Sequence, residues 1–268
     1  MPFLALSESV AAGFSTTVRL VATDMDGTLT RRGTFSASLL QALENLAEAG
    51  ISVLIVTGRS AGWVAGLATY LPVGGAIAEN GGLFYTDGDK PPVPLVPIAN
   101  FTEHRRELAQ VFRALQSDFP QLCEAEDNRF RLTDWAFDLS QLSPQELEQI
   151  AAWCDDRGWG FTYSSIQGHL KLPMQDKAKG VLQVLGDRFP QLSPHNVVTV
   201  GDSPNDASLF DASVFPHSVG VANIAQYRDR LPYLPQYITQ AEEGEGFCQL
   251  AHFLRSTANG DRQNLSLQ

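Results

Sequence analysis

The first part of the chain alternates short apolar runs with amphipathic stretches. The runs at residues 18–23 (VRLVAT) and 51–58 (ISVLIVTG) are rich in β-branched residues and end at turn-forming residues. Such continuous apolar runs are typical of strands buried on both faces of a parallel sheet. Between them, in SASLLQALENLAEAG at residues 36–50, leucines recur every three or four positions and a glycine ends the run. This spacing predicts an amphipathic helix.

The alternation of strands and helices continues to about residue 85 and returns in the last third of the chain. A second helix is expected to begin after Ser60 and to end before Pro72, and a strand interrupted by ENGG is expected within residues 74–85. Strands that alternate with helices predict an α/β fold with a doubly wound parallel sheet. The later elements are expected as a helix at 179–189, a strand at 197–202, a helix start at 205–213, and short strands within 214–223 and 235–239.

A stretch of different character lies between these two parts. It begins with the proline-rich DGDKPPVPLVP and contains helical patterns at 103–115 and 143–158, the second with Ser143 and Glu146 placed for a capping box. An alternating segment at 129–139 and a hairpin-like segment at 161–173 predict strands. The first dozen residues and the polar tail after Leu254 are expected to be frayed. These patterns predict a core domain formed by residues 1–86 and 173–268, and an inserted α+β domain formed by residues 87–172.

Composition narrows the choice of partners. The chain has 268 residues, 44% of them apolar, which is enough for a substantial core. Its 19 basic and 30 acidic residues give a formal charge of −11, which argues against nucleic acid or an anionic membrane as the partner. The three cysteines are far apart and odd in number, so they are expected to be reduced. No run approaches the roughly 18 apolar residues of a membrane helix. The N-terminus lacks the basic start of a secretory signal, so a cytoplasmic protein is expected.

Polar side chains follow three of the predicted strands at the point where each strand ends. Ligands of an open parallel sheet bind beyond the carboxyl ends of its strands, so we expect these side chains to share one crevice. Several carboxylates in one place require a cation, and oxygen ligands with no histidine or cysteine nearby favour Mg²⁺. The residues are Asp24 and Asp26 after the first strand, Thr57 and Arg59 after the second, and Asp202, Ser203, Asn205 and Asp206 after the later one.

This set of groups suits phosphoryl transfer. A carboxylate beside Mg²⁺ can attack phosphorus and form an aspartyl-phosphate, and a second acid two residues on can protonate the leaving oxygen and then activate water. Transfer also needs positive charge and hydrogen-bond donors around the phosphoryl oxygens. Thr57, the backbone amides after Asp24 and a lysine are candidates for these contacts.

Four segments, in order, resemble the motifs of a known family. DMDGTLT, IVTGRS, a lysine followed by glycine, and GDSPND are similar to the four motifs of the haloacid dehalogenase superfamily of phosphatases. The match covers the core, about two thirds of the chain. The insert between the second and third motifs, preceded by AENGG, resembles the branch with a large α+β cap. That branch includes Cof-type sugar-phosphate phosphatases and the sucrose, trehalose and mannosylglycerate phosphate phosphatases.

The resemblance implies roles for the residues that match the first three motifs. Asp24 is implied as the nucleophile, and Asp26 as the general acid/base whose backbone carbonyl also reaches Mg²⁺. Thr57 is implied as the phosphate-binding hydroxyl. Lys179, which precedes a glycine as in the family pattern, is preferred as the lysine of the third motif, with Lys177 as the alternative.

The fourth motif and the insert supply the remaining candidates. The resemblance implies that Asp202 is a metal ligand and that Asn205 and Asp206 hold the waters of the metal or the lysine. Arg59 is expected either to bind the substrate phosphate or to pair with a carboxylate of the core. Aromatic residues of the insert, Trp135, Phe137, Trp153 and Trp159, are expected in its core. Further substrate-binding candidates are Asn80 in AENGG and Arg129, Arg131, His169 and Lys171 on the strand-like segments of the insert.

Together these patterns predict a Mg²⁺-dependent phosphatase that hydrolyses a small phosphorylated metabolite, with a sugar phosphate preferred, through an aspartyl-phosphate intermediate. One alternative is a phosphosugar mutase similar to phosphomannomutase, although GDSPND looks more like the hydrolases. The other alternative is a catalytically inactive metabolite-binding module, against which the intact set of carboxylates argues. The sequence carries no indication of the oligomeric state.

Overall fold

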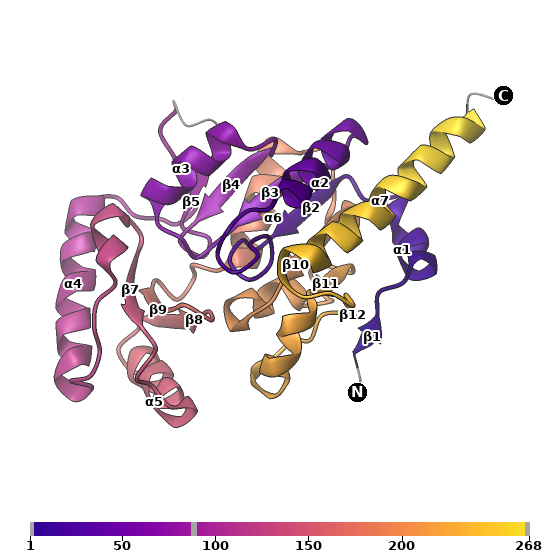
Figure 1. The fold of residues 1–268 in the computed structure, drawn as a ribbon. Coiled ribbons are helices and arrows are strands. Elements are labelled where there is room, and N and C mark those ends of the chain that lie inside the picture. The colour runs from indigo at the N-terminus through magenta and orange to yellow at the C-terminus, as the bar shows by residue number, and fades with distance from the viewer. Residues whose placement is uncertain (1–2, 87–89, 266–268) are drawn as a thin grey trace.

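A nine-stranded sheet forms the larger part of the molecule. The computed structural model describes residues 3–86 and 90–265. The strand order is β1-β12-β11-β10-β2-β3-β4-β5-β6, and every pair from β1 to β4 is parallel, whereas β5 and β6 are antiparallel additions at one edge (Figure 1). The strands are β1 Leu4–Ala5, β2 Leu20–Thr23, β3 Ser52–Val56, β4 Gly75–Ala78, β5 Leu83–Tyr85, β6 Val93–Pro94, β10 Val197–Gly201, β11 Ser218–Gly220 and β12 Tyr237–Ile238.

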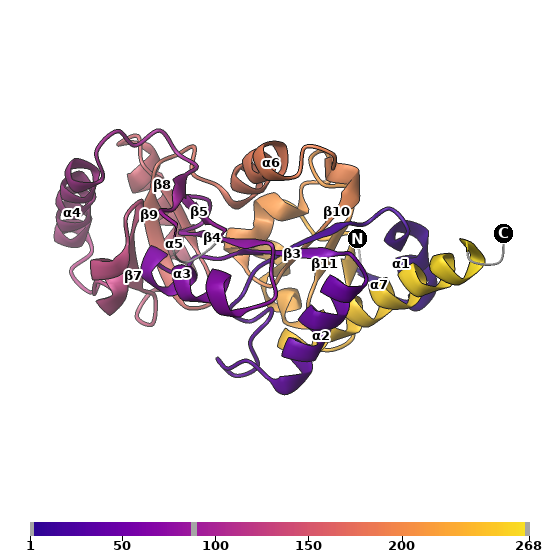
Figure 2. The same ribbon diagram turned by 90° about the horizontal axis from the view of Figure 1, so that it is seen from above.

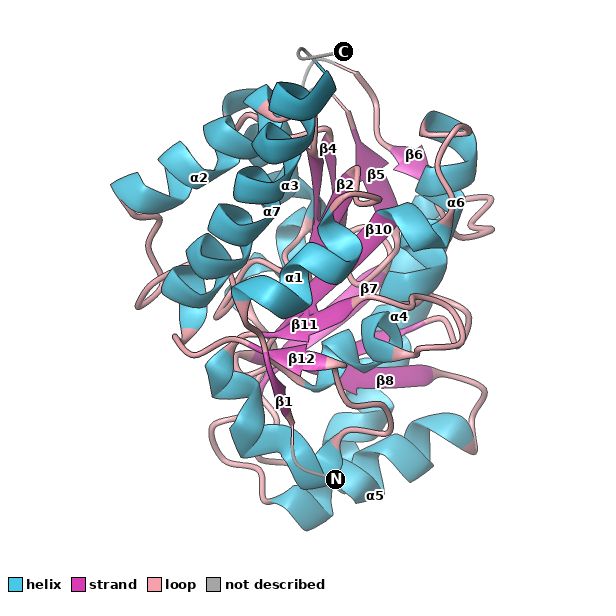
Figure 3. Ribbon diagram, turned by 90° about the vertical axis from the view of Figure 1, so that its right-hand side faces the viewer, coloured by secondary structure: helices cyan, strands magenta, loops and turns pink. Residues whose placement is uncertain are grey.

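Helices cover both faces of this sheet, as a doubly wound fold requires. On one face pack α1 (Glu8–Ser15), α2 (Ala37–Glu48), α3 (Ala61–Tyr70) and α7 (Glu243–Leu265) (Figures 2 and 3). The other face carries α6 (Lys177–Arg188) and two 3₁₀ segments, η3 (Pro204–Phe210) and η4 (Ala222–Arg230). A third 3₁₀ turn, η2 (Pro194–Asn196), leads into β10.

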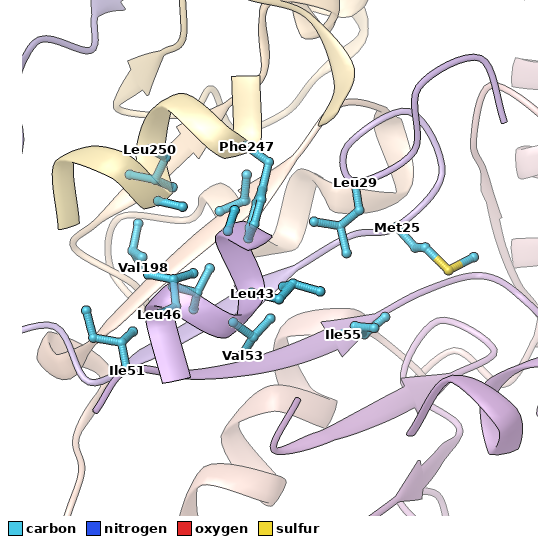
Figure 4. Packing of buried hydrophobic residues seen from close by; sticks show 14 of the residues in the cluster. Met25, Leu29, Leu43, Leu46, Ile51, Val53, Ile55, Val198, Phe247 and Leu250 are labelled. Carbon is cyan, nitrogen blue, oxygen red and sulfur yellow. The ribbon is translucent and has the colours of Figure 1, made fainter. Parts of the chain in front are cut away.

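Side chains alternate between the two faces along each strand, so each face has its own core. On the face of α2 and α7, Val53 and Val198 pack with Leu43, Leu46 and Phe247 (Figure 4). On the α6 face, a second cluster is formed by the strand residues that point to that face, together with side chains of α6 and η3. The continuous apolar runs of the sequence arise because both faces of these strands are buried.

A second, three-stranded antiparallel sheet lies beside the first with the order β7-β9-β8. It consists of β7 (Asp134–Asp138), β8 (Gly160–Tyr163) and β9 (Gln167–Lys171), and α4 (Phe101–Asp118) and α5 (Pro144–Asp155) pack with it in one core (Figure 1). The capping box at the start of α5 is formed, with the Ser143 hydroxyl and the Glu146 carboxylate each accepting from the other's backbone N–H. The four aromatic residues predicted for the core of this part all pack in or against that cluster: Trp135, Phe137, Trp153 and Trp159.

Several local expectations are wrong. Residues 129–139 do not form one strand, because their first part belongs to the 3₁₀ segment η1 (Glu126–Phe130) and only β7 is extended. The helix expected at 205–213 is the 3₁₀ segment η3. Residues 3–12 are not frayed: β1 pairs with β12, and the side chains of Leu6 and Ala11 are buried, whereas residues 1 and 2 lie outside the described residues. The polar tail continues α7 as far as Leu265.

The division into domains stays a proposal, with one adjustment. The expected first boundary, at residue 87, lies outside the described residues. Strand β6, at Val93–Pro94, still belongs to the large sheet through its pairing with β5. We therefore propose that the inserted domain begins after β6 and ends near residue 172, after β9. Within the part of the chain that the structure describes, no helix is long and apolar enough to cross a membrane.

The ordered N-terminal segment leads to a stability prediction. The Phe14 side chain is only 3% exposed and stacks on the rings of His217 and Tyr237, at centroid distances of 5.0 and 5.9 Å. We expect Phe14→Ala to lower the free energy of unfolding by about 3 to 5 kcal/mol, because it leaves a cavity in the core. Leu4→Ala, at a side chain that is 59% exposed, is the control and should change it by less than about 0.5 kcal/mol. Urea unfolding of both variants measures the difference, and equal effects would show that the segment does not contribute to the core.

Candidate active site

Three neighbouring strands of the large sheet end at the same place. Strands β10, β2 and β3 are adjacent and parallel, with Thr23 in register with both Val200 and Ile55. The residues that follow them, Asp24, Thr57 and Asp202, are all buried. The predicted convergence of these strand ends is confirmed: Asp24 and Asp202 offer carboxylate oxygens within 4.8 Å of each other, and Asp24 and Thr57 line one cavity.

A lysine lies between two of the buried carboxylates, and it is Lys177. Its Nζ donates to Asp24 Oδ1 and to Asp206 Oδ1, each at 2.6 Å. The preference for Lys179 is wrong, because that side chain is exposed. Asp176 caps α6 and accepts a hydrogen bond from the backbone N–H of Lys179, so Lys177 is the first residue of the helix. Residues two apart on a helix face different directions, and only the first of these lysines points toward the strand ends.

The carboxylates of Asp24, Asp202 and Asp206 form a tight buried cluster. Each offers an oxygen, and these oxygens lie within 4.8 Å of one another. Asp206 is fixed by Lys177 and by the backbone N–H groups of Asp202 and Ser203, at 3.0 and 3.1 Å from its Oδ2. Asp202 accepts from the Thr28 hydroxyl at 3.2 Å, and Asn223 donates to its other oxygen at 2.9 Å.

The electrostatics of this cluster favour a bound cation. Burial raises the pKa of Asp24 to about 7, although Lys177 opposes the shift. Burial, together with the charges of Asp24 and Asp206, raises the pKa of Asp202 well above its usual range. These shifts show that ionising all three carboxylates beside a single ammonium is unfavourable unless a further positive charge is present. Three converging carboxylate oxygens without sulfur or imidazole form a donor set that a divalent cation fits.

A glycine allows the first motif to approach this cluster. Gly27 has φ +80°, and a Cβ at this position would overlap the carboxylate of Asp202. Both the backbone conformation and the close approach therefore require glycine here. The Asp26–Gly27 turn therefore brings the loop that follows β2 against Asp202, which follows β10.

The Asp26 side chain is bound by an arginine. Arg59 binds it in a bidentate ion pair, with both N···O distances at 2.7 Å. The Arg59 guanidinium also lies over the Trp63 ring, 4.9 Å from its centroid. Of the two roles considered for Arg59, pairing with a carboxylate is the one that the structure shows.

Two adjacent cavities lie at this site. A small cavity of about 20 Å³ is lined by groups from both sheets, and an adjoining cleft of about 560 Å³ shares three of its lining residues. The β8–β9 turn therefore covers the strand ends of the large sheet. The shared residues are Arg59, Ile166 and Gln167, and the small cavity is completed by Asp24, Asp26, Thr57, Gly58, Ser164, His169 and Asn205.

Of the cationic residues predicted to bind substrate in the insert, two line a cavity and two are buried. His169 lines the small cavity, and Arg129 lines the larger cleft, where its guanidinium lies 4.7 Å from the Phe130 ring centroid. Arg131 is buried and bonded to Asp127, Asp134 and the Gly58 carbonyl. Lys171 is also buried and donates to the Gln175 carbonyl. The expectation that Arg129 and Arg131 alternate on a strand is wrong, because Arg129 lies in η1.

Asn80 and Glu79 act at the boundary between the two sheets. The Asn80 amide oxygen accepts from Asn205 Nδ2 at 3.0 Å, which places it behind the cavity wall. Glu79, with φ 53°, is buried and accepts from the backbone N–H groups of Ala61, Leu132 and Thr133 at 2.6 to 3.0 Å. It therefore links the start of α3 to the segment that leads into β7.

The sequence reasoning missed Glu79 and Asn223. Glu79 had only its place in AENGG as a signal, and glutamates beside glycines are ordinary in turns. Asn223 follows β11, one strand beyond the three considered, and donates to Asp202. Extending the strand-end argument to that strand would have found it.

Comparison with known proteins agrees with this geometry. The profile of the haloacid dehalogenase-like hydrolase family matches residues 21–93. A phosphoglycolate phosphatase of Methanopyrus kandleri is 32% identical over 248 residues, which cover 88% of this chain and 95% of the relative. A crystal structure of a Thermoplasma acidophilum protein superimposes with a TM-score of 0.70 at 23% identity, over 89% of this chain and 99% of the other. The sucrose-phosphatase of Synechocystis gives 0.67 at 18% identity, over 87% and 97%.

The fold and the buried carboxylates thus define a hydrolase of the α/β type. The chain belongs to the haloacid dehalogenase superfamily, in its Cof-type branch, and is a phosphoric monoester hydrolase. These similarities argue against the alternative of a catalytically inactive module.

The two lysines of α6 provide a matched test. Lys177→Met leaves buried carboxylates without their ammonium, so we expect the free energy of unfolding to fall by about 3 to 5 kcal/mol. Phosphatase activity should fall at least ~100-fold, because the lysine also orients Asp24. Lys179→Met should stay within about 0.5 kcal/mol of the parent and retain its activity. Urea unfolding and phosphate release measure both effects, and the reverse pattern would contradict this assignment of the lysine.

Proposed function

We propose that the protein is a Mg²⁺-dependent phosphatase that hydrolyses a small phosphorylated metabolite, a sugar phosphate, through an aspartyl-phosphate on Asp24. The observation that carries the proposal is the contact of Lys177 with Asp206 and with Asp24, which lines the small cavity. This contact orients the Asp24 carboxylate in a cavity that Thr57 also lines, where both could contact a phosphoryl group.

In the first step a carboxylate oxygen of Asp24 forms a bond to phosphorus as the bond from phosphorus to the ester oxygen breaks. Asp26, once released from its ion pair with Arg59 and protonated, gives its proton to the departing ester oxygen, which leaves as an alcohol. In the second step Asp26 takes a proton from a water that attacks phosphorus, and inorganic phosphate leaves while Asp24 is restored. The hydroxyl of Thr57 and the ammonium of Lys177 hydrogen-bond phosphoryl oxygens throughout.

Asp24 and Asp202 would hold the Mg²⁺ with their carboxylates, and the backbone carbonyl of Asp26 would be a further ligand. The ion neutralises the charge of the phosphoryl oxygens when bound. Asp206 is already engaged by Lys177 and two backbone N–H groups, which supports a role in holding the lysine. Asn205 accepts from the Ser203 hydroxyl at 2.8 Å and lines the cavity, which suits a role in holding the waters of the metal.

The larger cleft suits the leaving group of the substrate. At about 560 Å³ it falls within the usual range for small-molecule sites. The aromatic side chains of Trp63 and Phe130 are about half exposed there. The carboxylates of Glu124 and Asp138 also line the cleft and can accept hydrogen bonds from hydroxyl groups. Aromatic rings can stack on the face of a sugar, and the neighbouring carboxylates can bind its hydroxyls, so this lining suits a sugar. Structural similarity to a sucrose-phosphatase supports this class of substrate, whereas the name of the Methanopyrus relative points to a smaller one.

Replacing the nucleophile tests the chemistry. Asp24→Asn should lower phosphate release from any accepted ester by at least ~1,000-fold, because an amide does not form the covalent intermediate. Asp187→Asn, on the exposed side of α6, is the matched control and should retain activity. Assays of sugar phosphates with and without Mg²⁺ measure this effect. Activity in Asp24→Asn equal to that of the parent, with the control also active, would contradict the proposed intermediate.

A further inference from the structure

A line of three buried charged or polar side chains leads from the insert to the small cavity. Arg131 Nη1 donates to Asp134 Oδ1 at 2.9 Å, and Asp134 Oδ2 lies 2.9 Å from His169 Nδ1. All three residues are at most 2% exposed in their side chains. The imidazole is thus held by a carboxylate that is itself held by a guanidinium.

These contacts define which ring nitrogen carries a proton. Arg131 and His169 lower the pKa of Asp134 to about 2 against the effect of burial. The ionised carboxylate only accepts hydrogen bonds, so His169 Nδ1 must be the donor. Burial lowers the pKa of His169 despite its carboxylate partner. At neutral pH the ring is therefore neutral, and its Nε2 presents a lone pair.

That lone pair lies beside the catalytic residues. His169 lines the same small cavity as Asp24, Asp26 and Thr57. A Cβ on Gly58, the residue after Thr57, would come within 3.3 Å of His169 Nε2. Arg131 also donates to the Gly58 carbonyl at 2.9 Å, so one guanidinium fixes both the loop and, through Asp134, the ring.

We infer that His169 Nε2 accepts a hydrogen bond from a hydroxyl of the substrate close to the phosphoester, and that Asp134 is the residue that positions it. The inference rests on the proposed function, since it concerns the same site. A carboxylate at that place offers only acceptor oxygens and would meet the lone pair without a proton between them. His169 is therefore a specificity-determining residue that selects a hydroxylated leaving group over a carboxylated one.

This selection would separate the chain from relatives that carry the name phosphoglycolate phosphatase. Three substrates with the same two-carbon skeleton test it: 2-hydroxyethyl phosphate, ethyl phosphate and phosphoglycolate. They end in a hydroxyl, a methyl and a carboxylate. For the parent enzyme with Mg²⁺ at pH 7.5, we expect kcat/KM for 2-hydroxyethyl phosphate to exceed that for ethyl phosphate by about 10-fold, and that for phosphoglycolate by more.

Two variants distinguish the effect of the His169 ring itself from the effect of its orientation by Asp134. His169→Phe should bring the ratio of 2-hydroxyethyl phosphate to ethyl phosphate close to 1. In Asp134→Asn the amide oxygen must face Arg131, which only donates, so the amide NH₂ faces His169 Nδ1. Nε2 then carries the proton and becomes a donor. The ratio of 2-hydroxyethyl phosphate to phosphoglycolate should fall at least ~10-fold. His252→Gln, at an exposed ring of α7, is the control and should keep the parent ratios.

A measurement on the parent protein does not depend on these variants folding. Nitrogen-15 NMR of the imidazole should show His169 neutral, with its proton on Nδ1. A proton on Nε2, a parent preference for phosphoglycolate, or a His169→Phe variant with unchanged ratios would each overturn the inference while leaving the phosphatase intact. Failure of the parent to release phosphate from any ester, including a generic aryl phosphate, would instead overturn the proposed function and this inference with it.

Discussion

The site is built around the compensation of buried charge by Lys177. Isolated carboxylates in a protein interior are costly, and three of them meet at the ends of two adjacent strands. The ammonium of Lys177 lies 2.6 Å from an oxygen of Asp24 and 2.6 Å from an oxygen of Asp206. Burial alone would lower the pKa of this lysine, but its two carboxylate partners raise it, so it stays charged. The remaining negative charge is what makes the cluster suited to a cation.

The second sheet completes the site and is tied to the first by buried polar contacts. Arg131 reaches the Gly58 carbonyl, and Glu79 binds both the start of α3 and the backbone around Thr133. These contacts place the β8–β9 turn over the strand ends and leave a narrow cavity next to a wider cleft. The same arginine orients His169 through Asp134, so the closure of the site and its proposed selectivity share one set of contacts.

Much of this arrangement could be predicted from the sequence, because apolar periodicity and polar strand ends are local signals. The parallel sheet, its helices and the meeting of Asp24, Thr57 and Asp202 followed from them. The choice between Lys177 and Lys179 could not, because it depends on which residue begins α6. Arg131 looked like a substrate cation, although Asp127 and Asp134 bind it in the interior. The N-terminal segment looked frayed because its partners, β12 and α7, lie more than 200 residues away.

Direct measurement of metal binding tests the central claim, that the buried carboxylates carry more negative charge than Lys177 neutralises. Calorimetric titration of Mg²⁺ into the metal-free protein should show one ion bound per chain, and Asp202→Asn should abolish this binding while the protein stays folded. Absence of binding to the folded parent at millimolar Mg²⁺, or undiminished binding by Asp202→Asn, would contradict the account.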